Sequence, residues 1–363
     1  MKLLHFADLH LDAPFAWAGP VAAARRRRNR RETLVRIVEL AEAEGVDAVL
    51  CGGDLFEHDR VHPDTLEFIR ATLARTTIPV YLAPGNHDWY SARSPYAFVD
   101  WPPNVTVFSE ARLRPIALAE GLTLWGAAHR APANTDDFFA SFRPDRGGVH
   151  IALAHASERS ALPWQDTDTQ PHAAFDAAEL EAADIAHAFL GHFHLPRDAA
   201  RHTYPGNPDP LDFGEEGERA AVVAEIAPSG AVERRRVRVA VSPVHDVVLS
   251  VDGLTHSDDV LARAATLVAG LSGFVRLTLI GELGPAAHLD PRELAALGAH
   301  LDALIVIANR LEIGYDLAAI EREPTIRGQF VRDAAAIDDP DRRRRVILTG
   351  LRALEGRTDL EVA

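Results

Sequence analysis

Apolar runs of strand length alternate with helical patterns in the first quarter of this 363-residue chain. The runs KLLHFADLH, VDAVLCGGD and IPVYLAPGNHD indicate buried strands, and residues 31–44 and HPDTLEFIRATLAR between them indicate helices. Strands joined through helices usually run parallel, so the alternation predicts an α/β fold with a mainly parallel sheet and helices on both faces. Ligands of such sheets gather at the carboxyl ends of the strands.

Five apolar runs, the three above and GVHIALAHAS and DIAHAFLGHFHLP, end in polar residues of metal-binding type. These residues are Asp8, His10, Asp54, Asn86, His87, His155, His192 and His194. Because the carboxyl ends of parallel strands share one edge, we expect the polar residues after the first three runs to converge. His155, His192 and His194 join the set because they end later buried strands and have the donor types that a metal site needs. A single Asp in a glycine-rich turn is usually part of the turn, so the prediction depends on the whole set.

The residue types in this set suit a pair of divalent ions. Mixed carboxylate, amide and imidazole ligands favour Mn, Fe or Zn, whereas an all-oxygen set favours Mg or Ca. Asp54 is a natural bridge, because a carboxylate can give one oxygen to each ion. Two such ions polarise a phosphoryl oxygen and activate water for in-line attack on phosphorus. His87, which follows Asn86, could then give a proton to the leaving oxygen.

The pattern changes after Pro103. The runs NVTVFSE, RPIALAE and LTLWGAAH indicate hairpins in a second sheet. The paired strands RAAVVAEIA and AVERRRVRVA follow a turn-rich segment, and we expect a first domain over residues 1–243. Strand and helix patterns then restart, which predicts a small α/β domain over 244–314. Residues 315–363 indicate a helical tail that is amphipathic and basic in DPDRRRRVILTGLRALEG.

Composition and charge limit the partners. The net charge of −15 argues against nonspecific adhesion of the whole chain to nucleic acid, because attraction to phosphates needs clustered Lys and Arg. The stretch ARRRRNRRETL could supply a local contact through Arg25, Arg27 and Arg28; the alternative is a solvated first turn of a helix. No apolar run is long enough for a bilayer and no secretory signal is evident, so we expect a cytoplasmic protein without membrane contact.

The strings DLH, GGD, GNHD, H and GHFH, in this order, resemble the motifs of calcineurin-like metallophosphoesterases. The resemblance implies an α/β (α+β) fold, a four-layer β-sandwich flanked by helices. It also implies a role for each residue of the set: one ion held by Asp8, His10, Asp54 and His194, a second by Asp54, Asn86, His155 and His192, and His87 as the catalytic histidine.

A narrower likeness covers nearly the whole chain. The segments LLHFADLHLDAPF, VDAVLCGGDLFEHD, PVYLAPGNHDWY, YPGNPDPLDFGEEG and RLTLIGEL are similar to bacterial DNA repair exonucleases of the SbcD and YhaO type, relatives of the nuclease half of the Mre–Rad complex. This likeness implies two Mn²⁺ ions, cleavage of DNA phosphodiesters and a capping domain after the core. It further implies a homodimer and an SMC-like coiled-coil ATPase partner of the SbcC type, docked partly on the C-terminal helices.

One position departs from this likeness. Some relatives carry a histidine three residues after the bridging aspartate, where this chain has Glu57. His58 follows one position later and is the remaining candidate there for contact with DNA.

Three functions stay open on the sequence. The first is a DNA exonuclease and endonuclease that works with an ATPase in DNA repair or processing. The second is a small-molecule phosphatase or cyclic-nucleotide phosphodiesterase, because the same metal chemistry serves both. The third is a noncatalytic scaffold, against which the complete ligand set argues. The capping domain favours the nuclease.

Overall fold

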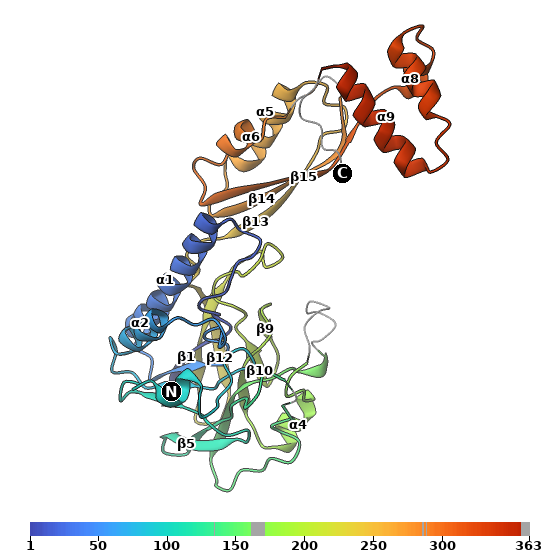
Figure 1. Cartoon of the computed structure of the whole chain (residues 1–363). Coiled ribbons are helices and arrows are strands. Elements are labelled where there is room, and N and C mark those ends of the chain that lie inside the picture. The colour runs from blue at the N-terminus through green and yellow to red at the C-terminus, as the bar shows by residue number, and fades with distance from the viewer. Residues whose placement is uncertain (134, 161–170, 285–286, 288, 357–363) are drawn as a thin grey trace. The chain divides into compact units, whose positions relative to one another are not determined.

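The computed structural model describes residues 1–133, 135–160, 171–284, 287 and 289–356 (Figure 1). The chain divides into two compact units, Met1–Val244 and His245–Ala363. In the residues just given, no helix combines the length and apolar character that a membrane span requires.

The first sheet of unit 1 has six strands in the order β12-β11-β1-β2-β3-β4. Four of them run parallel and supply the sheet's centre and one edge: β1 (Lys2–Phe6), β2 (Ala48–Cys51), β3 (Val80–Leu82) and β4 (Val105–Val107). The other two, β11 (Ala220–Ile226) and β12 (Val232–Arg238), add antiparallel strands at the opposite edge. The predicted parallel sheet is therefore confirmed and extended by a C-terminal hairpin. The expectation of helices on both of its faces is wrong, because helices cover one face and the second sheet packs on the other.

The second sheet has the order β5-β6-β7-β8-β10-β9. Its strands are β5 (Arg114–Ala119), β6 (Leu122–Gly126), β7 (Val149–His155), β8 (His187–Gly191), β9 (Arg197–Asp198) and β10 (His202–Tyr204). Only β5 and β6 form the hairpin expected after Pro103. The expectation that NVTVFSE joins this sheet is wrong, because β4 pairs parallel with β3 after a crossover through the short helix α3 (Pro95–Phe98). A three-residue strand is too short for its own pattern to report which sheet it joins.

Side-chain alternation along the strands builds four layers. In β1, Leu4 and Phe6 pack against α1 (Pro20–Glu44) and α2 (Pro63–Leu73), whereas Leu3 faces the second sheet. The outer face of the second sheet packs on α4 (Ala177–Ala182), which lies on the opposite side of unit 1 from α1 and α2 (Figure 1). The fold is thus helix, sheet, sheet, helix, as expected. Each fully buried Leu or Phe stabilises it by roughly 2 kcal/mol.

Helix α1 starts eleven residues earlier than the apolar pattern predicts, at Pro20 and not at residue 31. The apolar stripe begins at Leu34, but the buried face continues backward through Arg30 and Arg26. The helix ends where expected, because Gly45 adopts a left-handed conformation with φ 58°.

Unit 2 holds a three-stranded sheet of order β13-β14-β15. Its strands are β13 (Val244–Ser250), β14 (Phe274–Leu283) and β15 (Ala303–Ile313), and α5 (Ser257–Val268) and α6 (Pro291–Ala296) pack with them around one core. A separate small core joins α7 (Leu317–Glu321), α8 (Ile326–Ala334) and α9 (Pro340–Leu354). The domain limits 1–243, 244–314 and 315–363 stay predictions.

Candidate metal centre

The structure brings all eight strand-end residues together at the carboxyl edge of the two sheets. Three sets of ligand atoms each lie within 4.8 Å of one another: Asp8, His10 and His194; His10, Asp54 and His87; and Asp8, Asp54 and His155. Asn86 lies next to these sets, with its Oδ1 2.9 Å from His155 Nε2. His192 lies on the same side, with its Nδ1 3.2 Å from Asn86 Oδ1. The roles given to these residues as ligands and catalytic acid stay predictions.

The first position for a cation lies between two imidazoles. His10 Nδ1 donates to Glu57 Oε1 at 2.8 Å, and His194 Nδ1 donates to Glu215 Oε1 at 2.6 Å. In the neutral rings both Nε2 atoms therefore carry lone pairs, yet they face each other at 3.2 Å. Two acceptors at this distance repel unless one of them is protonated or a metal ion lies against both. The residues present thus fit a metal ion.

The second position lies around His155. Its Nδ1 donates to Gly52 O at 2.8 Å, while its Nε2 faces Asn86 Oδ1 at 2.9 Å and Asp54 Oδ2 at 3.2 Å. Burial would lower the pKa of His155, but the Asp54 and Asp8 carboxylates outweigh burial and raise it to about 9. Without a metal, a proton on Nε2 satisfies the facing oxygens; a divalent ion would displace that proton. Asp54 Oδ2 lies 3.7 Å from His10 Nε2 and 3.2 Å from His155 Nε2, so this carboxylate is near both positions, as the predicted bridging role requires.

The backbone at the centre is strained. Asp8, His10, Asp54 and His192 have φ of 57°, 45°, 52° and 107°, a region that residues other than glycine seldom adopt. Such strain persists only where surrounding contacts impose it, and it is common at functional sites. Gly85 is required by close approach, because a Cβ there would overlap Asp54 Oδ1.

Sequence reasoning missed three carboxylates that hold the centre in place. Glu57 and Glu215 fix the rings of His10 and His194, as described above. Asp88 is fully buried and accepts hydrogen bonds from Tyr96 Oη and from the backbone N–H groups of Asp54, Leu55 and Gly85. Carboxylates behind metal-binding histidines fix the tautomer and orient the ring. Position could have pointed to Glu57 and Asp88, which lie within three residues of predicted ligands. Glu215 lies in the segment YPGNPDPLDFGEEG, which carries part of the likeness but received no role of its own.

His87 lies at the exposed rim, with 47% of its side chain accessible. Its backbone N–H donates to Asp54 Oδ1 at 2.8 Å, and its Nδ1 donates to Glu57 Oε2 at 3.1 Å. Burial would lower the pKa of His87, but the Glu57 hydrogen bond and the nearby carboxylates raise it to about 9. Bound cations would oppose this rise by like-charge repulsion. The Glu57 carboxylate therefore links the imidazole of His10, a predicted ligand, to the accessible ring of His87.

The arginine run divides into two groups. Arg26 and Arg30 are fully buried: Arg30 donates to Leu9 O and Asp209 O, and Arg26 donates to Asp209 Oδ1 and Ser242 O. Neither a DNA-binding cluster nor a solvated first turn describes these two residues. Arg30 braces the loop between Asp8 and His10 through Leu9 O, and Arg26 ties α1 to Asp209 and Ser242. The candidates Arg25, Arg27 and Arg28 stay at least partly exposed, as does His58.

A sequence profile of the calcineurin-like phosphoesterase family matches residues 1–196, more than half of the chain. The chain belongs to this family. It is therefore a metal-dependent phosphoesterase, a hydrolase whose family uses divalent ions, and the cluster at the carboxyl edge of its sheets is a plausible place for them. Cys51, beside this cluster, is a buried free thiol.

Three curated relatives of this phosphoesterase are similar in sequence. The uncharacterized metallophosphoesterase YhaO of Bacillus subtilis is 26% identical over 241 residues, 62% of this chain and 57% of YhaO. The DNA double-strand break repair protein Mre11 of Methanopyrus kandleri is 26% identical over 272 residues, which cover 66% of this chain and 57% of that protein. Mre11 of Aeropyrum pernix is 29% identical over 238 residues, which cover 59% of this chain and 55% of that protein. The chain thus spans just over half the length of these relatives.

Solved structures of the phosphoesterase fold are more distant. A crystal structure of TT1561 from Thermus thermophilus is 12% identical with a TM-score of 0.39, covering 65% of this chain and 99% of that one. A dimetal phosphatase from Danio rerio is also 12% identical with a TM-score of 0.39, and the match covers 62% of this chain and 92% of the phosphatase.

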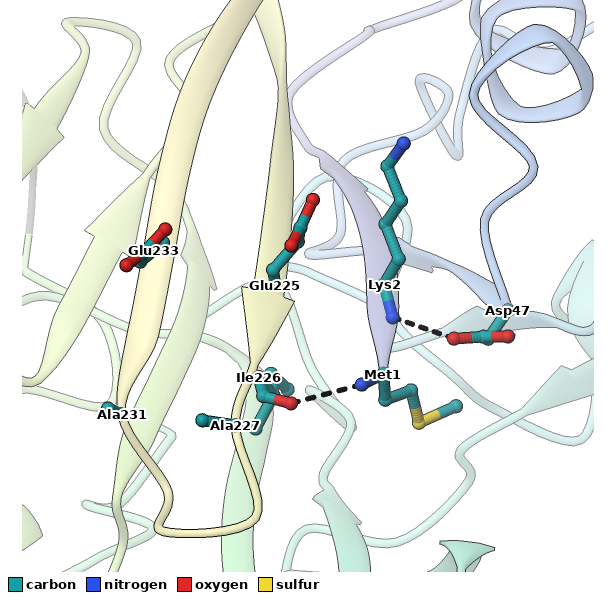
Figure 2. A pocket seen from close by; sticks show the side chains of 8 residues that line it. All are labelled: Met1, Lys2, Asp47, Glu225, Ile226, Ala227, Ala231 and Glu233. Carbon is teal, nitrogen blue, oxygen red and sulfur yellow. Dashed lines mark hydrogen bonds between the residues drawn. The ribbon is translucent and has the colours of Figure 1, made fainter.

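A hollow of about 500 Å³ lies at the other end of β1, away from the ligand set. Figure 2 shows its lining, which includes Met1, Lys2, Asp47, Glu225 and Glu233. The terminal amine of Met1 donates to Ile226 O at 3.0 Å, and the Lys2 backbone N–H donates to Asp47 Oδ2 at 2.7 Å. The Met1 amine and the Lys2 backbone N–H thus bond to neighbouring groups, and the hollow contains none of the three clusters of ligand atoms described above.

Proposed function

We propose that this phosphoesterase is a Mn²⁺-dependent DNA nuclease that hydrolyses phosphodiester bonds as an exonuclease and endonuclease in DNA repair or processing. The observation that carries the proposal is the similarity to two proteins named for DNA double-strand break repair. The Methanopyrus alignment covers 66% of this chain, more than the 196 residues that the family profile matches. The likeness to that relative therefore extends beyond the catalytic motifs.

Each side chain of the centre has a task in this proposal. Two divalent ions supply Lewis acidity, which polarises a phosphoryl oxygen and makes a nearby water more acidic. Asp8, His10 and His194 would hold one ion, Asn86, His155 and His192 the other, and Asp54 both. Mn²⁺ suits this mixture of oxygen and imidazole ligands.

His87 is the proposed general acid. Its Nδ1 donates a hydrogen bond to Glu57 Oε2, so Nε2 is the nitrogen that can act on a substrate. The accessible ring can give a proton to the oxygen that leaves phosphorus, and proton transfer of this kind accelerates hydrolysis by about 10²–10⁴-fold.

The proposal extends to partners and location. We propose a homodimer in the cytoplasm that works with an SMC-like ATPase of the SbcC type. The helices α7–α9 are the proposed docking segment, since Ile326 and Leu354 are large apolar side chains that stay 80% and 50% exposed there. Co-purification of the ATPase with the full chain, and its loss on substitution of Ile326 with Glu, would support this assignment.

The test is hydrolysis of linear DNA in the presence of Mn²⁺. We expect degradation that EDTA stops and Mn²⁺ restores. Hydrolysis of p-nitrophenyl phosphate or of cyclic nucleotides, with no hydrolysis of DNA, would replace the proposal with the small-molecule phosphoesterase. Absence of any hydrolysis in the metal-loaded protein would favour the scaffold.

A further inference from the structure

Two aromatic rings stack at the rim of the centre. The His58 and Trp89 rings have centroids 4.0 Å apart and planes inclined by only 18°. Both residues are partly exposed. His58 Nδ1 has no hydrogen-bond partner among the described residues, so no polar contact at that nitrogen explains the ring's position. The pair is a flat aromatic surface with access to solvent.

The pair is fixed next to His87. The His58 backbone N–H donates to His87 O at 2.8 Å. Trp89 directly follows Asp88, whose buried carboxylate accepts from Gly85 N at 2.6 Å and Tyr96 Oη at 2.6 Å. On the other side, Tyr90 N donates to His129 O at 2.8 Å. Both ring-bearing segments are therefore tied to the backbone that carries the metal centre.

We propose that the His58–Trp89 pair is a stacking platform for the base of the nucleotide that carries the leaving oxygen. The inference rests on the proposed nuclease function, which supplies a substrate with bases. His87 is the proposed proton donor to that oxygen, and the platform is bonded to the His87 backbone. A base attached to the leaving group would therefore lie close to the two rings.

The chemistry of the surface suits a base of any identity. Every nucleobase has a flat π-face, and stacking on an aromatic side chain contributes roughly 1–3 kcal/mol per base without reading its sequence. The neighbouring Tyr90 is less suitable, because the Arg130 guanidinium already lies over its ring at 5.2 Å. The platform thus predicts a preference for substrates with a base at the cut site, whatever the base is.

The test compares two single-stranded oligomers with the same length and phosphate backbone. One carries thymine at every position and the other carries abasic residues, and kcat/KM is measured for each with Mn²⁺. We expect the wild-type protein to favour the thymine oligomer. Trp89→Leu should reduce this preference about tenfold, a loss of the size expected for one base–aromatic stack. Trp89→Phe, which keeps a flat ring, should retain most of it.

Controls separate this inference from the proposed function. Phe98 is an aromatic residue that is 64% exposed on α3, and Phe98→Leu should leave the preference unchanged. If Trp89→Leu fails to fold, His58→Leu removes the other half of the platform and should show the same reduction. An unchanged preference in a folded Trp89 or His58 variant would overturn the platform, as would a wild-type protein that cuts both oligomers equally. A wild-type protein that cuts neither oligomer nor linear duplex DNA would overturn the nuclease function itself, and one that cuts duplex DNA but neither oligomer would overturn the platform alone.

Discussion

The two ends of strand β1 differ in how their polar groups are satisfied. At the amino end, the hollow of about 500 Å³ is bordered by ordinary pairs, such as Lys2 Nζ with Glu44 Oε2 at 2.7 Å. At the carboxyl end, two imidazole nitrogens face each other at 3.2 Å. The difference lies in convergence: in the part of the chain that the structure describes, the hollow at the amino end holds no cluster of ligand atoms, whereas the carboxyl end brings such atoms within 4.8 Å of one another on a strained backbone. Matched substitutions at the two ends test this difference.

The largest effect is expected for the bridging carboxylate. Asp54→Asn removes the charge that lies at both cation positions, so hydrolysis of bis(p-nitrophenyl) phosphate should fall to the background rate and bound Mn²⁺ should decrease. Asp47→Asn changes the same group at the exposed amino end and should leave both unchanged. Equal losses in the two variants would remove the distinction between the ends.

The next effect is expected for the accessible histidine. His87→Ala should lower the rate of phosphodiester hydrolysis by about 10²–10⁴-fold, because it removes the proton donor to the leaving oxygen. The content of bound Mn²⁺, measured by elemental analysis, should stay that of the wild type. Unchanged turnover in this variant would remove His87 from the mechanism.

A smaller effect is expected for the carboxylate behind the two histidines. Glu57→Gln weakens the hydrogen bonds that orient His10 and His87, and loss of such a partner typically costs 10–100-fold in activity or metal affinity. Steady-state rates and a Mn²⁺ titration measure the two losses. Glu233→Gln, an exposed change at the amino end, should alter neither. A Glu57 variant as active as wild type would show that the rings need no such support.

The smallest effect is expected for the exposed part of the arginine run. Changing Arg25, Arg27 and Arg28 to Ala should reduce the slope of log K against log salt for DNA binding, by at most about 0.9 for each phosphate that the variant no longer neutralises. Fluorescence anisotropy with labelled duplex DNA at several salt concentrations measures this slope. A slope identical to that of the wild type would show that these three side chains are solvated and do not contact DNA.

The position of the centre could be predicted from the sequence because it follows from topology. Apolar runs that each end in Asp, Asn or His identify strand ends, and the carboxyl ends of parallel strands must share an edge. Asp8 and Asp54 follow neighbouring strands of the first sheet, so topology brings them together. His155 ends β7 of the second sheet, and its place beside them depends on how the two sheets pack, which the strand patterns alone do not give. The resemblance then assigned the residues to two ions, which spacing alone could not do.

The supporting residues could not be predicted in the same way. Glu215 reaches His194 across 21 residues that include the short strands β9 and β10, and no periodic pattern encodes such a contact. Arg26 and Arg30 did leave a signal. They lie four residues apart, and Arg30 lies four before Leu34, so they continue the buried stripe of α1 backward. The buried stripe is hard to recognise there, because an arginine is expected at the surface unless the acceptors of its hydrogen bonds are known.

The most direct test of the central claim is anomalous diffraction from crystals of the full chain grown with Mn²⁺. The account predicts two peaks at the carboxyl edge: one between His10 and His194, the other beside Asn86, His155 and His192. Asp54 should contact both. A single peak, or peaks only at the amino end near Asp47 and Glu225, would contradict it.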